Sequence, residues 1–198
     1  MSPKRDVSDE RKNQILEAAM IVFSRNGFQG TRMDDIVTES GLSKGTLYWY
    51  FDSKEEIIIS LLTRLFDQEM TDLVTIKNKP GTASERLLQF TKDSIINLKQ
   101  MIAGLPITFE FYAMAFRHEG VRDKLKTYFR QYLEEIPPLV QQGIERGEFR
   151  EVNPIDVAIA TGAIIEGTLL LWIYDEANVD LDKHTLAAME MLLAGIRK

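Results

Sequence analysis

Residues 31–56 read TRMDDIVTESGLSKGTLYWYFDSKEE, and this stretch decides the fold. Two short segments with apolar residues at helical spacing flank Gly41-Leu42-Ser43, which has the size of the turn in a helix-turn-helix. Glycine permits a sharp turn because it adopts a positive φ without a Cβ clash. An ordinary helical hairpin in a core would show the same spacing, so the spacing alone leaves both interpretations open.

The second of these segments carries three consecutive aromatic residues, Tyr48-Trp49-Tyr50. Neighbouring residues on a helix point about 100° apart, and Leu47 and Phe51 already take the inward face. Part of the trio must therefore face outward, and clustered exposed aromatic residues usually mark an interface. Gly45 lacks a side chain near the start of this helix, which favours close approach to another surface.

Lys54 is expected in the first turn of the next helix, where the helix dipole disfavours a cation. A phosphate at that position would be bound by the lysine and by the free N–H groups of the helix. The segment therefore combines hydroxyl, aromatic and cationic groups suited to a nucleic-acid backbone.

Many positions between residues 8 and 56 agree at fixed spacing with one known signature. They are Phe23-x3-Gly27-Phe28-x2-Thr31-x4-Ile36-Val37-x2-Ser40-Gly41-Leu42-Ser43-Lys44-Gly45-Thr46-Leu47-Tyr48-x-Tyr50-Phe51-x2-Lys54-Glu55-Glu56. In these positions the chain resembles the DNA-binding segment of the tetracycline-repressor (TetR/AcrR) family. Val37 and Ser40 stand where that family often has alanine.

The resemblance implies a role for each matching residue. Phosphate contacts are implied for Thr31, Arg32, Tyr48, Tyr50 and Lys54. Approach to base edges is implied for Lys44, Gly45, Thr46 and Trp49. Thr31 could also be a helix cap, and Arg32 could be a solvated surface charge.

Helical spacing continues through the rest of the chain, so we expect an all-α fold. A three-helix DNA-binding domain is expected over residues 1–52, with its first helix capped by Ser8 and ending at Gly27, and its second capped by Thr31 with Asp34. The fourth helix is expected to start with a second such pair, Ser53 and Glu56, and to end at Pro80-Gly81. Further helices are expected at about 82–102, 107–117, 121–146, 154–174 and 183–196, with Pro137-Pro138 kinking or splitting the third of these.

Residues 53–198 are expected to form a larger helical ligand-binding and dimerisation domain. The run Gly147-Glu148-Phe149, Asn153-Pro154, Ala158 and Ile165-Glu166-Gly167 resembles one subgroup of the same family. That resemblance implies a homodimer built on the last two helices, where the small-residue pairs Ala158/Gly162 and Ala163/Gly167 permit close approach.

A ligand site is expected around the segment 107–117, which is apolar on nearly every side. All-round apolarity indicates burial or a cavity lining, and an aromatic stripe is more often core than pocket. The candidate ligand-binding residues are Phe109, Glu110, Tyr112, Phe116 and Trp172. Glu166, the odd carboxylate in an apolar helix, is expected to have a structural role.

Composition limits the other classes of function. The net charge is −6, but residues 1–50 hold seven basic and seven acidic residues, so the case for DNA rests on local chemistry. The chain has no cysteine and only two histidines, His118 and His184, which argues against an enzyme and against a metal or other cofactor.

The N-terminal residues do not resemble a secretory signal, and we expect a cytoplasmic protein. The apolar run 157–174 contains Glu166 and lacks basic anchors, so we expect a helix buried between other helices and no membrane partner.

Together these features predict a ligand-responsive transcriptional regulator, and we expect it to act as a repressor. It would bind an inverted-repeat double-stranded DNA operator as a homodimer and would be released by a small, largely apolar effector. The alternative is a helical protein-interaction module that binds no specific DNA sequence.

Overall fold

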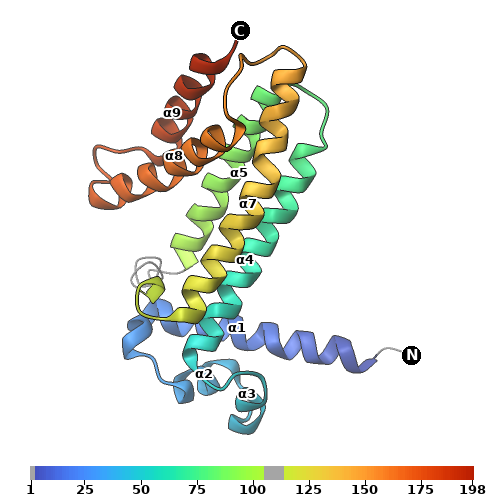
Figure 1. Ribbon diagram of the computed structural model, residues 1–198. Helices are drawn as coiled ribbons and strands as arrows, with labels where there is room; N and C mark the ends of the chain where they lie inside the picture. The colour runs from blue at the N-terminus through green and yellow to red at the C-terminus, as the bar shows by residue number, and fades with distance from the viewer. Residues whose placement is uncertain (1–2, 105–113) are drawn as a thin grey trace. The chain divides into compact units, whose positions relative to one another are not determined.

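The computed structural model describes residues 3–104 and 114–198, and every helix or strand it assigns there is an α-helix (Figure 1), as predicted. The expected helix at 107–117 lies almost wholly outside the described residues. The helices are α1 (Pro3–Gly30), α2 (Met33–Ser40), α3 (Lys44–Tyr50), α4 (Lys54–Lys77), α5 (Ala83–Gly104), α7 (Glu119–Glu145), α8 (Pro154–Tyr174) and α9 (Leu181–Ile196).

The chain divides into two compact units. The first comprises Met1–Leu65 and Lys99–Lys126, and the second comprises Phe66–Leu98 and Thr127–Lys198. Helices α4, α5 and α7 each contribute residues to both units. The boundary expected at residues 52 and 53 stays a prediction.

Helix α1 of the first unit supplies one buried face, as its spacing predicts: Ile15, Ala18, Ala19, Val22 and Phe23 are all buried. At Gly27 the backbone leaves helical geometry, with φ 69° and ψ 166°, close to the predicted end. The predicted start is wrong, because α1 begins at Pro3 and Ser8 lies inside the helix. The Ser8 hydroxyl accepts a hydrogen bond from Tyr50 Oη at 3.3 Å instead of capping the helix.

The turn between α2 and α3 forms at Gly41, whose φ of 65° is the left-handed conformation expected there. Ser43 then caps α3 by accepting from the Thr46 N–H at 3.1 Å. The cap of α2 is one residue later than predicted, because Asp35 accepts from the Arg32 N–H at 2.8 Å. Thr31 instead donates its hydroxyl to the Gly27 carbonyl, four residues earlier, at 2.7 Å.

The start of α4 forms much as predicted. Ser53 Oγ accepts from the Glu56 N–H at 3.2 Å, and the Glu56 carboxylate accepts from the Asp52 N–H at 2.7 Å. The second half of the expected cap therefore reaches one residue further back. The helix ends at Lys77, just before Pro80 and Gly81.

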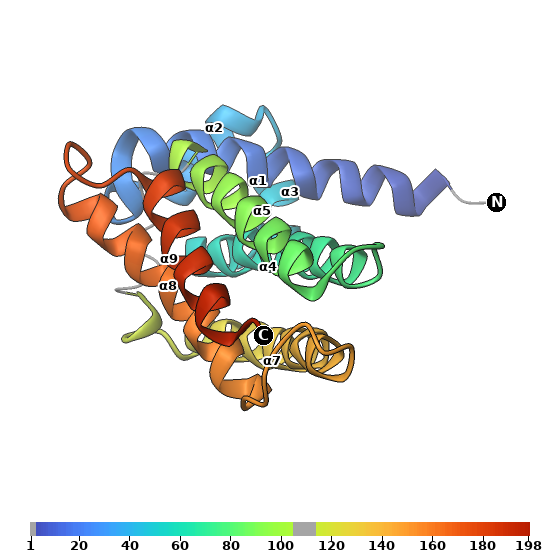
Figure 2. The same ribbon diagram turned by 90° about the horizontal axis from the view of Figure 1, so that it is seen from above.

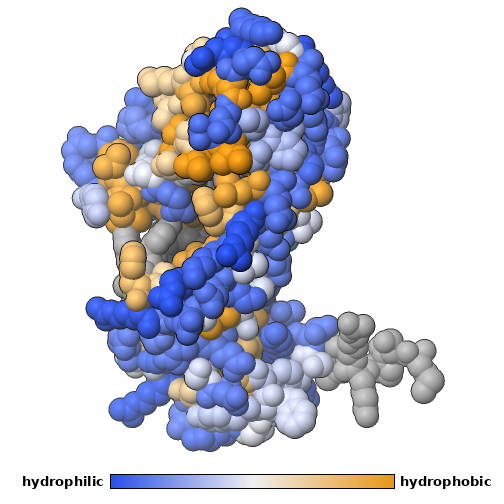
Figure 3. All heavy atoms as spheres, in the orientation of Figure 1, coloured by the Kyte–Doolittle hydropathy of each residue, from blue (hydrophilic) through white to orange (hydrophobic). Residues whose placement is uncertain are grey.

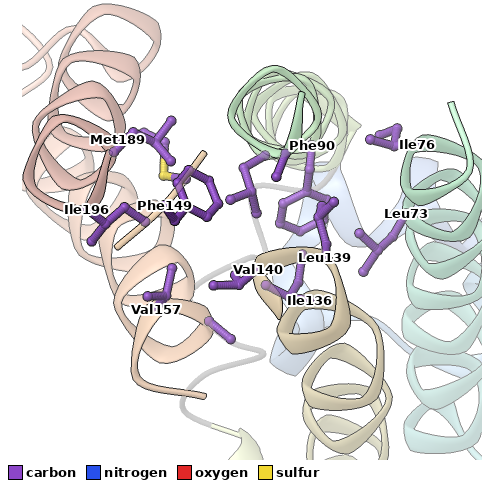
Figure 4. Close-up of a cluster of buried hydrophobic side chains, with 14 of the residues drawn as sticks. Leu73, Ile76, Phe90, Ile136, Leu139, Val140, Phe149, Val157, Met189 and Ile196 are labelled. Atoms are coloured by element: carbon purple, nitrogen blue, oxygen red, sulfur yellow. The ribbon is translucent and has the colours of Figure 1, made fainter. Parts of the chain in front are cut away.

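In the second unit five helices share one hydrophobic core, to which each contributes aliphatic or aromatic side chains (Figure 4). The labelled members are Leu73 and Ile76 of α4, Phe90 of α5, Ile136, Leu139 and Val140 of α7, Val157 of α8, and Met189 and Ile196 of α9, with Phe149 from the connection between α7 and α8. This core holds together segments that lie more than a hundred residues apart in the chain.

Helix α7 runs from Glu119 to Glu145 as one helix with Pro137 and Pro138 inside it, so of the two predicted outcomes, a kink or a split, the split does not occur. An interior proline costs about 3 kcal/mol or more. Ile136, Leu139 and Val140 are fully buried beside the prolines, and each such burial contributes roughly 1.5–3 kcal/mol. Tertiary packing on this side therefore offsets the lost ladder bonds.

The connection Gly147-Glu148-Phe149 joins three chain segments. The Glu148 carboxylate accepts from the Ala83 N–H at the start of α5, at 2.6 Å. The Lys198 N–H donates to the Glu148 carbonyl at 3.2 Å, and the Arg150 N–H donates to the Ile196 carbonyl at 2.8 Å. The buried Phe149 ring lies between these contacts. This short motif therefore anchors both the beginning of α5 and the end of the chain.

Helix α8 is buried on one face within the single chain, so the prediction of a helix buried between other helices is met on that face alone. Ala158 is fully buried, and Gly162 faces Tyr132 of α7. On the opposite side Ala163 and Gly167 are exposed. The exposed apolar side chains of α8 are Ile155, Ile159, Leu170, Leu171 and Tyr174, and Met191 of α9 is exposed as well.

Helices α8 and α9 lie side by side in both ribbon views (Figures 1 and 2). Apolar side chains gather on the surface in the region of these two helices (Figure 3). Within the described residues α8 is also the one helix long and apolar enough to cross a membrane by length and composition, with 33% of the apolar window buried. A helix that covers a protein core or an interface between chains meets the same criterion.

Candidate nucleic-acid interface

The outer face of α3 is aromatic. Leu47 is fully buried and fixes the rotation of the helix, so that Trp49 is 84% exposed and Tyr48 41% exposed. Tyr50 is half-buried. The expectation that part of the aromatic trio faces outward is confirmed. A tryptophan this exposed on a seven-residue helix is costly in water unless another surface covers it.

Lys44, the first residue of α3, is paired with an acidic residue of α2. Its Nζ lies 2.7 Å from Asp34 Oδ1 and 5.9 Å from the centre of the Tyr48 ring. The hydrogen bond and charge of Asp34 raise the pKa of Lys44 above its ordinary value. The sequence interpretation placed Asp34 in the cap of α2 and missed its pairing with Lys44, because the two residues are ten positions apart and no periodicity links them.

The other residues predicted to approach base edges are at the start of the same helix. The hydroxyls of Ser43 and Thr46 are hydrogen-bonded at 2.8 Å, so Thr46 closes the first turn of α3. Gly45 is exposed, and a Cβ built there would meet only Ser43 Oγ, at 3.9 Å. The structure therefore brings Lys44, Gly45, Thr46 and Trp49 onto one short helix.

Lys54 does not have the free ammonium group expected of a phosphate ligand. Its Nζ donates to the carbonyl oxygens of Phe28 at 2.7 Å, Thr31 at 3.1 Å and Gln29 at 3.3 Å. An ammonium group has three N–H donors, and all three are accounted for by these carbonyls. These carbonyls lie at and just after the end of α1, where the helix itself supplies no N–H partner for them. The phosphate contact of Lys54 stays a prediction.

The other residues predicted to contact phosphates differ in how far their side chains are exposed to solvent. Thr31 is buried, and Tyr50 donates to Ser8, so both hydroxyls have partners inside the first unit. Arg32 and Tyr48 are exposed. Of the five residues, these two are therefore the ones whose side chains reach solvent freely enough to meet a phosphate.

Of the five predicted ligand-binding residues, only Phe116 and Trp172 lie among the described residues. Phe109, Glu110 and Tyr112 lie outside the described residues. Phe116 is 85% exposed and Trp172 is half-buried, and the ligand site itself stays a prediction. Within residues 3–104 and 114–198 no group of His, Asp and Glu side chains is placed to hold a metal ion.

The second unit contains a polar cluster of buried and half-buried side chains that the sequence interpretation missed. Ser94 of α5 donates to the Glu69 carboxylate of α4 at 2.9 Å, and Tyr128 of α7 is hydrogen-bonded to the same carboxylate. Burial raises the pKa of Glu69, and burial together with the Glu69 charge raises that of Tyr128. The Tyr128 ring stacks on Phe66, with centroids 4.2 Å apart.

A signal for this cluster is present in the sequence. Phe66, Glu69, Leu73 and Ile76 follow the spacing of one helix face, and the last two are buried. A carboxylate at an inward position of such a face indicates a polar site inside the core. Glu166, the other carboxylate in an apolar helix, is exposed, and its charge helps to raise the pKa of Glu69.

Comparison with known families gives two matches that together span most of the chain. Residues 15–61 match the family of bacterial regulatory proteins of tetR type. Residues 83–197 match the C-terminal domain of BetI-type transcriptional repressors.

Individual relatives agree with these matches. The chain is 35% identical over 159 residues to the HTH-type transcriptional regulator YfiR of Bacillus subtilis, covering 78% of this chain and 77% of that one. It is 28% identical over 189 residues to the fatty acid metabolism regulator protein of the same organism, covering 92% and 94%. The crystal structure of the regulator FadR from B. subtilis in complex with stearoyl-CoA superposes with a TM-score of 0.70 at 25% identity, covering 93% of this chain and 98% of that chain.

Proposed function

This chain belongs to the tetR family of bacterial regulatory proteins and is a transcriptional regulator, and we propose that it represses its genes by binding an inverted-repeat operator as a homodimer. A small, largely apolar effector would release it from the DNA. DNA binding is supported chiefly by the outer face of α3, where Trp49 is 84% exposed on the same short helix as Lys44 and Gly45. These are the positions from which a recognition helix reads the major groove.

The homodimer rests on the apolar side of α8 and α9 that the chain leaves uncovered. Ile159, Ala163, Gly167 and Leu170 follow one helix face, and all four are exposed. Contiguous exposed apolar surface of this kind usually lies in an interface. A second copy of the chain would cover it through a two-fold axis, and the same symmetry requires an inverted repeat in the DNA.

The proposed effector is a small, largely apolar molecule. Its support is the similarity to a fatty acid metabolism regulator and to a regulator crystallised with stearoyl-CoA. The Glu69, Ser94 and Tyr128 cluster would supply the few polar contacts that a mostly apolar ligand site needs. We propose that the protein acts by binding rather than by catalysis, and that it works in the cytoplasm, where its DNA lies.

The test of DNA binding starts with selection of genomic fragments by the purified protein. The enriched fragments should contain an inverted repeat, and a duplex carrying both half-sites should bind more tightly than one with a single half-site. Trp49→Ala should weaken operator binding while leaving the melting temperature nearly unchanged, because the side chain is exposed. Binding that shows no sequence preference would favour the protein-interaction module instead.

The test of effector control is a thermal-shift screen that includes long-chain acyl-CoA thioesters, followed by titration of any ligand found. Ligand affinity should fall when operator DNA is present, by the same factor by which the ligand weakens DNA binding. Typical coupling is about 1–3 kcal/mol. Equal ligand affinity with and without operator would show that the ligand does not control DNA binding.

A further inference from the structure

The ion pair between Lys44 and Asp34 connects the two helices of the helix-turn-helix. Lys44 begins α3, Asp34 lies in the first turn of α2, and their charged atoms are 2.7 Å apart. Both side chains remain well exposed, at 62% for Lys44 and 65% for Asp34. The pair therefore lies on the surface that the proposed function assigns to DNA, and the inference below rests on that function.

Two neighbouring carboxylates in α2 bind different partners. Asp35 accepts from the Arg32 N–H and so closes the start of its own helix. Asp34 points to the other helix and holds Lys44. Helix capping therefore does not explain Asp34, whose contact with Lys44 is a charge-assisted hydrogen bond between helices.

The pairing changes what Lys44 offers to DNA. A free lysine is a charge on a flexible stem with three rotatable donors, and it binds a phosphate of any sequence. The bond to Asp34, together with the contact to the Tyr48 ring, restricts the ammonium group to one region of the surface. The Asp34 carboxylate would also repel phosphates that approach α3 without a compensating contact.

We infer that Asp34 is a specificity-determining residue, which withholds Lys44 from DNA that lacks the operator sequence. On the operator, base acceptors such as guanine O6 and N7 replace the carboxylate as partners of the lysine. On other DNA the lysine gains only a phosphate and the repulsion by Asp34 remains. Asp34 therefore weakens non-specific binding more than operator binding.

The test compares the wild type with Asp34→Asn, Lys44→Met and the double variant. A matched control is Glu17→Gln, which removes one negative charge from an exposed position of α1 in the same unit. Each protein is titrated by fluorescence anisotropy against the selected operator and against a scrambled duplex of equal length and composition, at several salt concentrations. Far-UV circular dichroism and melting temperature verify that each variant is folded.

Asp34→Asn should tighten binding to the scrambled duplex by about two- to five-fold, the range for exposed ion pairs, and should lower the ratio of operator to scrambled affinity. The salt dependence on scrambled DNA should steepen by up to about one phosphate contact. In the Lys44→Met background the Asp34→Asn change should alter the ratio less than it does in the wild type, because only the repulsion of phosphates by Asp34 is then removed. Glu17→Gln should leave the ratio at the wild-type value.

Three results would overturn the inference while leaving the proposed function intact: an unchanged ratio in Asp34→Asn, an equal change in the Lys44→Met background, or an equal change in Glu17→Gln. The last two would mean that net charge, and not the pairing with Lys44, sets the ratio. A wild-type protein that does not distinguish the operator from the scrambled duplex would reject the proposed function itself.

Discussion

Lys54 Nζ lies 2.7 Å from the carbonyl oxygen of Phe28 and 4.4 Å from the centre of the Phe28 ring. The first residue of α4 thus caps the last turn of α1 across 26 residues of chain. Lysine is well suited to this position, because carbonyls at a helix end attract a cation and the ring face adds a cation–π contact. The contact stabilises the segment from which α2 begins.

Lys54→Met keeps most of the side chain but removes its three donors. We expect weaker binding to operator and scrambled DNA alike, with no change in salt dependence, because no phosphate contact is lost. Unfolding should become easier by about 1–3 kcal/mol, the usual cost of unpaired polar groups. Anisotropy titrations over a salt series and denaturant unfolding measure the two effects.

The matched control for Lys54 is Arg32→Met, since Arg32 is exposed and remains a candidate phosphate ligand. That variant should lower the salt slope by about 0.9, the value for one phosphate. A similar decrease in the salt slope of Lys54→Met would support a phosphate contact by Lys54 and reject its capping role.

Gly143→Ala should destabilise the protein, because a Cβ at that position would lie 2.5 Å from Phe149 Cε2 and 2.9 Å from Ala83 Cβ. Overpacking of this kind typically costs about 1–3 kcal/mol. Thermal and denaturant unfolding would measure it. Combining the change with Phe149→Leu should cost less than the two single changes together, because the smaller side chain relieves the clash.

Gly162→Ala in α8 serves as the control for Gly143→Ala. Its nearest neighbour would be Tyr132 Oη at 3.7 Å, an ordinary contact. Alanine there should be neutral or slightly stabilising, because it suits a helix better than glycine. If Gly162→Ala were as destabilising as Gly143→Ala, the close packing under Phe149 would not be the cause.

Leu170→Glu should convert the proposed dimer into a folded monomer. Leu170 is 44% exposed within one chain, so the charge is tolerated in the monomer but would be buried against a second copy. Sedimentation velocity measures the change. Ile96→Glu, at a residue of α5 that is 50% exposed, should leave the dimer intact. A wild-type protein that sediments as a monomer at micromolar concentration would refute the dimer.

Glu69→Gln should raise stability at neutral pH. Burial, aided by the charges of Glu166 and Asp72, raises the pKa of Glu69 in the folded state. A raised pKa means that the contribution to stability is complete below the ordinary value of 4.5 and is lost as the pH rises through the folded value. Glutamine keeps an acceptor for Ser94 and Tyr128 without the charge.

The advantage of Glu69→Gln over the wild type should therefore shrink as the pH falls toward 4.5. Melting temperatures across a pH series provide the measurement, with Ser94→Ala as a control that removes one hydrogen bond but no titrating group. A constant difference between Glu69→Gln and the wild type at every pH would show that the carboxylate does not titrate in this range.

The sequence by itself determined the features that depend on short-range physics. Helix periodicity predicted the all-α fold and the buried face of α1, because residues three and four apart share one face whatever surrounds them. Gly41 and Ser43 specified the turn and the start of α3, since a left-handed glycine and a side-chain cap act within a few residues. The outward position of Trp49 followed from the inward position of Leu47 by helix geometry alone.

Only the tertiary structure decided which groups meet across the chain. The positive charge of Lys54 is evident from the sequence and predicts a phosphate contact, whereas the carbonyls that it binds at the end of α1 are brought to it only by folding. Asp34 and Lys44 meet because α2 and α3 pack against each other. The apolar pattern of α8 is the same whether its own chain or a second copy covers it. Periodicity states which residues share a face, but three-dimensional packing decides what that face contacts.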